Sequence, residues 1–137
     1  MSEVLAFYRD QPNKSGYTFT QVMGWDDKKL ETVHDYIQWL FPNDQISRFN
    51  PNAPLVDDED VAAFSSDPVL QERLAQAEQR IRNFWMLGDP DKAWWASRFN
   101  HNLLRVTRVI RCLHLLAGTE RANAFRQAAI SSAAAAK

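Results

Sequence analysis

The spacing of apolar residues along the chain follows helices and not strands. Apolar positions recur every three or four residues over long stretches, whereas the alternation typical of a half-buried strand is never sustained. This pattern predicts helices over about 27–41, 68–87 and 94–117. Asp26 suits the N-cap of the first helix, and Gly118 suits the residue after the third.

Shorter helices are predicted around these three. Residues 2–10 fit a short helix or an extended arm, and Thr18 or Thr20 is expected to cap a helix that ends at Gly24. Asp57 and Thr119 are expected to cap two further helices. The Ala-rich tail over 131–137 has nothing to bury, so we expect it to fray. The sequence therefore predicts an all-α, single-domain bundle of five to seven helices.

The connection over 42–56 is expected to be irregular because it contains three prolines and three asparagines. Loops of this length are usually fixed to the domain by their own apolar side chains or carry function. Ile46, Phe49 and Leu55 are the predicted anchors.

Composition supports one soluble domain. The chain has 137 residues, of which 45% are hydrophobic, and its five Trp and eight Phe indicate a large aromatic core. The net charge of −1 gives no general attraction to nucleic acid or anionic membranes. We find no signal-peptide pattern and no apolar stretch long enough to span a membrane, so we expect a cytoplasmic location. Cys112 has no partner for a disulfide and is expected to be a buried, inert thiol.

The helix predicted over 27–41 carries a polar row beside a broad apolar face. The apolar face contains Leu30, Val33, Tyr36, Ile37, Leu40 and Phe41. The polar row contains Glu31, His34, Asp35 and Gln38. These four positions fall at i, i+3, i+4 and i+7 and therefore share one side of a helix. Trp39 borders the row on its other side, so we expect the row to be partly buried.

A second polar row lies on the helix predicted over 98–117. The core face there contains Phe99, Leu103, Val106, Ile110, Leu113 and Ala117, and a second apolar strip contains Leu104 and Leu115. Between them lie His101, Arg105, Arg108 and Cys112. This row is cationic where the first is acidic, so the two rows are complementary.

Two interpretations of the facing rows remain open. In the first, Glu31 or Asp35 accepts bidentate hydrogen bonds from Arg105 or Arg108, which would fix the register of the two helices. In the second, the rows line a pocket where the arginines bind an anionic group. His34 or Gln38 would then orient the ligand, and His101 would lie beside it.

Other chemistry has weaker support. A Glu-x-x-His pair occurs once, at Glu31 and His34, whereas helical di-iron sites need two such pairs, so we expect no metal or other cofactor. The same two residues could serve as an acid–base pair in an enzyme. Residues 98–126 contain six Arg and one Glu, which leaves nucleic-acid binding through a basic face as another alternative.

Trp94 and Trp95 follow an Asp/Pro turn and are candidates for an exposed aromatic anchor at an interface. The alternative is that one of the two indoles fills the core and the other covers the start of the helix.

Five blocks in a fixed order carry a family resemblance. They are Phe7-Tyr8-Arg9, "LETVHDYIQWLFP" at 30–42, Asn52-Ala53-Pro54-Leu55, "LQERLAQAEQRIRNFW" at 70–85 and "HNLLRVTRVIRCL" at 101–113. Together they resemble the conserved region of the opioid growth factor receptor family over roughly residues 5–118. On this basis residues 1–118 form the conserved domain, and 119–137 add a C-terminal helix to it.

The resemblance implies a binding or interaction role. The animal namesake of the family is a nuclear and perinuclear protein that binds the opioid pentapeptide Met-enkephalin and restrains growth. It is unrelated in fold to the seven-helix opioid receptors. This chain has no cluster of five or more basic residues that would indicate nuclear import, so we expect a short stand-alone member. Its expected partner is a protein, a peptide or a small anion.

Overall fold

The computed structural model describes residues 2–46, 50–87, 95 and 102–135, and side chains as far as residue 132. These residues form eight helices and no strand. The helices are α1 (Glu3–Tyr8), α2 (Phe19–Met23), α3 (Asp27–Thr32), α4 (Tyr36–Leu40), α5 (Asp58–Ser66), α6 (Pro68–Phe84), α7 (Asn102–Leu116) and α8 (Thr119–Ala135). The predicted all-α class is confirmed.

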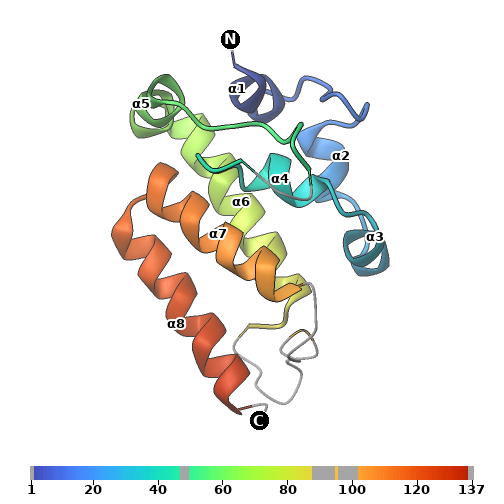
Figure 1. Ribbon diagram of the computed structural model, residues 1–137, viewed down its shortest axis with the longest axis vertical. Helices are drawn as coiled ribbons and strands as arrows, with labels where there is room; N and C mark the ends of the chain where they lie inside the picture. Colours follow the sequence, from blue (N-terminus) through green and yellow to red (C-terminus); the bar gives the residue numbers. More distant parts are fainter. Residues whose placement is uncertain (1, 47–49, 88–94, 96–101, 136–137) are drawn as a thin grey trace.

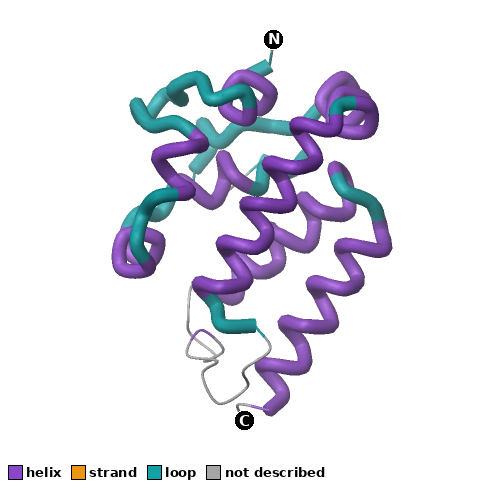
Figure 2. The backbone as a smooth tube through the Cα atoms, turned by 180° about the vertical axis from the view of Figure 1, so that it is seen from behind, coloured by secondary structure: helices purple, strands orange, loops and turns teal. Residues whose placement is uncertain are grey.

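Three long helices and five short ones make up the described part of the fold. Figure 1 shows α6, α7 and α8 running alongside one another, with α5 at the upper end of α6 and α1 to α4 in the upper and right-hand part of the view. The view from behind in Figure 2 shows the same arrangement. Helices α7 and α8 pack against each other as an antiparallel pair, and α5 contacts both α6 and α7. The turn between α7 and α8 uses Gly118 at φ +110°, a conformation that favours glycine.

Local capping signals set most helix starts. The Thr18 side chain accepts a hydrogen bond from the Gln21 backbone N–H and forms a capping box, and the Asp26 side chain caps α3. Asp57 forms a second capping box with Asp60 at the start of α5. The prediction of caps at Thr18, Asp26 and Asp57 is confirmed.

The predicted single helix over 27–41 is wrong, because the chain leaves the helical conformation between α3 and α4. Val33 is extended, with φ −87° and ψ 128°, and so ends α3. Asp35 precedes α4 but makes no side-chain cap; its carboxylate instead accepts hydrogen bonds from the hydroxyls of Ser15 and Tyr17. Because of this break, the described residues form eight helices, whereas five to seven were predicted.

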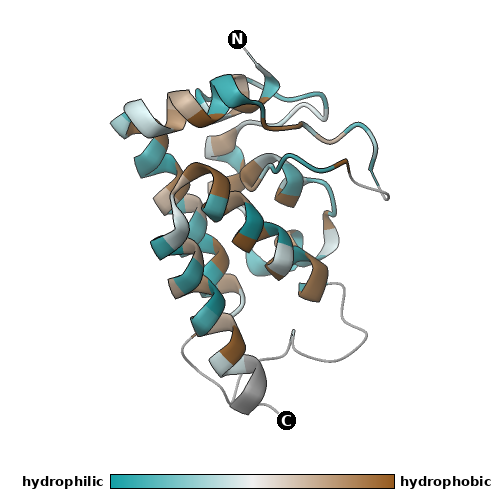
Figure 3. Cartoon of the chain, turned by 60° about the vertical axis from the view of Figure 1, so that its left-hand side comes forward, coloured by the Kyte–Doolittle hydropathy of each residue, from teal (hydrophilic) through white to brown (hydrophobic). Residues whose placement is uncertain are grey.

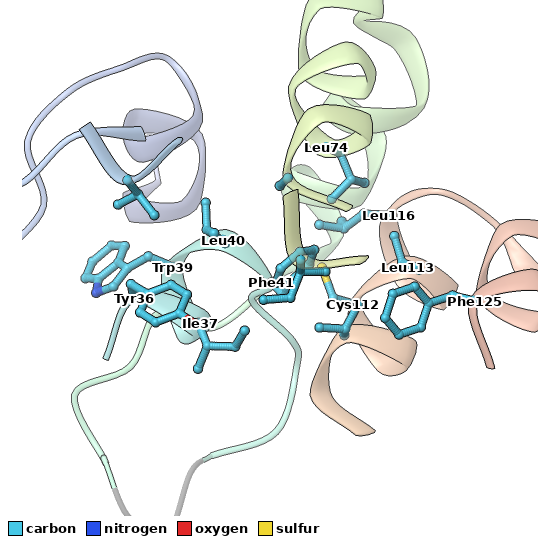
Figure 4. Close-up of a cluster of buried hydrophobic side chains, with 14 of the residues drawn as sticks. Tyr36, Ile37, Trp39, Leu40, Phe41, Leu74, Cys112, Leu113, Leu116 and Phe125 are labelled. Atoms are coloured by element: carbon cyan, nitrogen blue, oxygen red, sulfur yellow. The ribbon is translucent and has the colours of Figure 1, made fainter. Parts of the chain in front are cut away.

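Aromatic side chains fill the core, as their number predicts. Around α1, the Tyr8 ring lies 5.0 Å from that of Phe19 and 5.1 Å from that of Phe64, between centroids. Figure 4 shows Phe41 beside Cys112, with residues of α6 and α7 around them. Figure 3 shows hydrophobic and hydrophilic residues on different sides of the long helices, as amphipathic packing requires.

The connection over 42–56 is fixed differently from the prediction. Ile46 is 73% exposed and Leu55 is 46% exposed, so neither is an anchor, and Phe49 lies outside the described residues. Pro42, Pro54 and Val56 are buried in their place. The Val56 N–H donates to the Asn43 carbonyl at 2.9 Å in the one isolated bridge of the described chain. Helix α8 continues to Ala135, into the tail predicted to fray.

Candidate binding groove

Arg105 donates hydrogen bonds to the segment in which the chain leaves the helical conformation, between α3 and α4. Its side chain is 5% exposed and projects from α7 towards the break between α3 and α4. Its Nη1 atom donates to the Leu30 carbonyl at 2.9 Å, and its Nη2 atom donates to the Val33 carbonyl at 3.0 Å. Both carbonyls would otherwise accept from amides within a continuous helix. The guanidinium therefore replaces the helical donors that the break removes.

The remaining contacts of Arg105 also involve neutral groups. Nη1 lies 3.3 Å from the Tyr36 hydroxyl and 3.3 Å from Asn102 Oδ1. The guanidinium carbon lies 5.3 Å from the centroid of the Tyr36 ring, within range of a cation–π interaction. Arg105 is thus a structural residue with acceptors on every side.

The predicted hydrogen bonds from Arg105 or Arg108 to Glu31 or Asp35 do not connect the two polar rows. Glu31 accepts a hydrogen bond from Asn102 Nδ2 at 3.1 Å, and Asp35 accepts hydrogen bonds from the hydroxyls of Ser15 and Tyr17. The helical break changes the direction of residues 34–41, so Asp35 no longer follows Glu31 along one face. Peptide carbonyls take the positions expected for the carboxylates.

Arg108 differs from Arg105 in having few partners. Its Nε atom donates to the Phe41 carbonyl at 3.0 Å, and its Nη2 atom is buried with no acceptor within reach among the described residues. No carboxylate of the described chain forms an ion pair with it. Burial lowers the pKa of the Arg108 guanidinium below its ordinary value, although an arginine stays charged at physiological pH. A half-buried positive charge without a counter-charge is costly unless a partner is supplied.

Arg108 lines a groove between α7 and the segment around α4. The groove has a volume of about 530 Å³. His34, Ile37 and Gln38 line one side, Asn43, Gln45 and Ile46 continue it, and Leu104, Arg105, Thr107, Arg108 and Arg111 line the side formed by α7. The groove thus brings together four of the predicted site residues, His34, Gln38, Arg105 and Arg108. Asp35 and Glu31 are not among its lining residues.

Two of the apolar groove residues are the most exposed large apolar side chains among those described. Ile46 is 73% exposed and Leu104 is 64% exposed. The sequence pattern places Leu104 in an apolar strip beside the polar row, whereas the structure exposes it at the groove. Exposed apolar side chains beside a concave surface are typical of ligand sites.

Arg111 adds a third guanidinium at the groove, and a loop carboxylate neutralises it. Arg111 Nε lies 3.1 Å from Asp44 Oδ1, and Arg111 Nη2 lies 2.8 Å from Asp44 Oδ2, which is a bidentate pair. The hydrogen bonds from Arg111 lower the pKa of Asp44. Neither residue was among the predicted ligand-binding residues. Arg111 follows Arg108 by three positions and could have been added to the row, whereas nothing in the sequence pairs it with Asp44.

Other predicted residues lie away from the groove. Trp95 is 1% exposed, and its indole N–H donates to the Trp85 carbonyl at 2.7 Å, so it is a core residue and not an exposed anchor. Trp94 and His101 lie outside the described residues. Cys112 is completely buried, and this burial raises the pKa of its thiol, as expected for an inert cysteine.

Much of the positive charge between residues 98 and 126 is used inside the protein. Arg105 is buried, Arg111 pairs with Asp44, and Arg121 Nη2 lies 2.8 Å from Glu78 Oε1. Arg98 lies outside the described residues. The described part of this segment therefore offers little of the open basic face that the nucleic-acid alternative requires.

Comparison with known proteins identifies the family. The model of the opioid growth factor receptor (OGFr) conserved region matches residues 4–126. The chain belongs to this family. The match covers both α4 and α7, so the groove lies within the conserved region, and the resemblance seen in the sequence is confirmed.

Curated relatives show the same relationship. The opioid growth factor receptor of Mus musculus is 32% identical over 130 aligned residues, which cover 80% of this chain and 20% of the relative. The receptor of Homo sapiens is 31% identical over 130 residues, which cover 80% of this chain and 19% of the relative. The chain thus spans about a fifth of the length of these receptors. No solved structure matches the chain.

Two further observations concern the part of the chain that the structure describes. None of the helices there is both long and apolar enough to cross a lipid bilayer. Within the same residues, no three His, Cys, Asp or Glu side chains gather in a way that could hold a metal ion.

Proposed function

We propose that this protein is a non-enzymatic binding module whose groove between α4 and α7 takes an anionic group of a peptide. The observation that carries the proposal is Arg108, a half-buried guanidinium that lines the groove and has no counter-charge among the described residues. A carboxylate in the groove would supply that charge, and charged hydrogen bonds of this kind are among the strongest in proteins.

Each of the two interpretations, a structural network and a ligand pocket, is supported by a different arginine. The Nη1 and Nη2 atoms of Arg105 donate hydrogen bonds to the Leu30 and Val33 carbonyls, which supports a structural role for this residue. Arg108 donates a hydrogen bond to the Phe41 carbonyl through its Nε atom alone among the described contacts, which supports the pocket interpretation. Arg105 therefore builds one wall of the groove, and Arg108 is the residue proposed to contact the ligand.

The peptide class rests on the relatives and on the lining of the groove. The matched proteins are named as receptors of a growth factor, and the family resemblance implies a Met-enkephalin ligand. Ile46 and Leu104 offer apolar contacts next to the cation, which suits a carboxylate attached to an apolar residue. The C-terminal methionine of that pentapeptide has this chemistry.

Calorimetric titration of purified protein with Met-enkephalin, as free acid and as C-terminal amide, would test the proposal. We expect the acid to bind at least about tenfold more tightly than the amide, because one charged hydrogen bond contributes about 1.5–3 kcal/mol. In Arg108→Gln the two peptides should bind equally, because the group that distinguishes them is gone.

Arg126→Gln is the matched control. Arg126 is exposed on α8 outside the groove lining, so this variant makes the same change of net charge without touching the site. It should keep the preference for the acid. A preference for the acid that persists in Arg108→Gln would show that Arg108 is not the anion contact, and an absence of binding by both peptides would remove the enkephalin assignment.

A further inference from the structure

A cleft beside Trp25 lies outside the groove and has no part in the proposed function. It has a volume of about 560 Å³ and is formed by residues in and next to α2 and α3, which both lie on the right of Figure 1. The side chains of Tyr17, Trp25 and Lys29 line it, and the remaining lining residues are uncharged. None of the lining residues belongs to the groove at Arg108, so the cleft is a separate candidate site.

Two aromatic rings line the cleft, and both are held by contacts with the rest of the protein. The rings of Tyr17 and Trp25 meet edge to face, with their centroids 5.0 Å apart. The Tyr17 hydroxyl donates to Asp35 Oδ1 at 2.8 Å, and the Tyr36 ring packs edge to face against Trp25 with a centroid separation of 5.9 Å. A ligand therefore meets rings that are already in position, which reduces the entropy lost on binding.

A cation of the chain itself lies on one of these rings. Lys29 Nζ is 4.4 Å from the centroid of the Trp25 ring, within the range of a cation–π interaction. Lys29 forms no ion pair with a carboxylate among the described residues. Because Lys29 and Trp25 both line the cleft, this contact shows that the ring offers an electron-rich surface to a cation there.

We infer that this cleft binds a trimethylammonium group, of the kind found in choline and in trimethylated lysine, and that Lys29 occupies the position when no ligand is bound. Lys29 is exposed, and an exposed cation–π contact is weak, so the ammonium is easily displaced. A primary ammonium gives up hydrogen bonds with water when it settles on a ring. A trimethylammonium group has no N–H to desolvate, and its methyl groups bury apolar surface against the ring, so it competes well with Lys29.

The test uses two probes of the same shape, choline and the uncharged 3,3-dimethyl-1-butanol. Each is titrated into the whole chain in 150 mM salt and followed by the tryptophan indole signals in two-dimensional NMR. Choline should bind at least about fivefold more tightly than the alcohol, because only choline makes the cation–π contact. Equal binding of the two probes, or no binding of choline, would overturn the inference.

Lys29→Met tests the internal cation. This variant keeps an unbranched side chain and removes the ammonium, so choline should bind about two- to fivefold more tightly once its competitor is gone. Lys28→Met is the matched control, because Lys28 is also exposed on α3 but does not line the cleft. It makes the same change in net charge and should alter choline binding by at most about 1.5-fold, since salt screens surface charges. Equal tightening in the two variants would overturn the role of Lys29.

Further variants place the bound probe and separate this inference from the proposed function. Choline binding that survives Trp25→Leu would overturn the assignment, and Lys29→Met, at an exposed position, decides the same question if that variant fails to fold. Arg108→Gln should leave choline binding unchanged, because Arg108 is outside the cleft, and a loss there would also overturn the assignment.

A third probe identifies the source of the group. It is Nα-acetyl-trimethyllysine methylamide. If it binds more tightly than choline, the ligand is a methylated protein; if choline binds more tightly, the ligand is a free amine or a lipid headgroup.

Discussion

Replacing Arg105 tests whether one side chain maintains the break between α3 and α4. The variant Arg105→Met keeps most of the volume of the side chain and removes every donor. The carbonyls of Leu30 and Val33 then lose their partners at 2.9 and 3.0 Å. An unsatisfied buried acceptor costs about 1–3 kcal/mol, so two of them cost about 2–6 kcal/mol.

Part of this cost is recovered because the variant no longer buries a charge. We therefore expect a net loss of about 3 kcal/mol in the free energy of unfolding. For a chain of this size, such a loss lowers Tm by about 10 °C. Arg105→Lys should also be destabilised, because a single ammonium group cannot reproduce the two-pronged contact that the guanidinium makes with both carbonyls.

The assay is equilibrium unfolding in urea, followed by the fluorescence of the five tryptophans and by circular dichroism. Arg126→Met is the control, since Arg126 is exposed on the same C-terminal helical pair, and its midpoint should match that of the wild type. A loss below about 1 kcal/mol for Arg105→Met would refute the assignment, because it is less than one unsatisfied carbonyl should cost.

Buried tyrosines, the buried thiol of Cys112 and the strained backbone of Gly118 can each be tested by a simple measurement. Burial raises the pKa of Tyr8, Tyr17 and Tyr36 above the ordinary value. The free energy of unfolding that depends on these neutral side chains is therefore complete below about pH 10 and is lost as pH rises further. Absorbance at 295 nm should report their ionisation only together with unfolding. Independent ionisation near pH 10 in folded protein would contradict this. Cys112 should react with a thiol reagent only after denaturation, and rapid labelling of native protein would show that the α7 packing opens. Gly118→Ala should lower the free energy of unfolding by about 1–2 kcal/mol, because a φ of +110° strains a residue with a side chain although the space around it is open. An unchanged Tm in thermal unfolding would refute that strain.

The elements that could be predicted from sequence are those fixed by neighbours along the chain. Thr18, Asp26 and Asp57 each cap a helix through an amide three residues away, so the signal and its effect lie together in the sequence. The amphipathic spacing of α6 and α7 is local in the same sense. The all-α class follows from these elements.

The break between α3 and α4 could not be predicted because its causes are distant. The stretch over 27–41 has a continuous helical pattern, and the hydrogen bonds that favour the break come from distant residues, namely Arg105, Ser15 and Tyr17. Tertiary contacts outweigh helix propensity here. The same break explains why Asp35 turned away from the groove.

The two predicted polar rows lie on segments that face each other, but their contacts differ from the predicted ones. Complementary rows on two predicted helices indicated that the α4 segment and α7 face each other, and the groove lies there. Which arginine is satisfied depends on peptide carbonyls, which sequence patterns do not reveal. The contribution of Asp44 and Ile46 depends on the path of an irregular loop, for which periodicity gives no information.

The long reach of Arg105 has a consequence for the order of folding. It terminates α3 through a carbonyl 75 residues away in the sequence, and such distant contacts form only after a large loss of chain entropy. During synthesis, residues 27–41 leave the ribosome before Arg105 has been made, so their local propensity favours one continuous helix. The carbonyls of Leu30 and Val33 gain the Arg105 donors only when α7 docks, and the groove, which α7 lines on one side, is complete only then. A chain in which α7 has not docked therefore lacks the groove, and a molecule that binds there would stabilise the native state selectively.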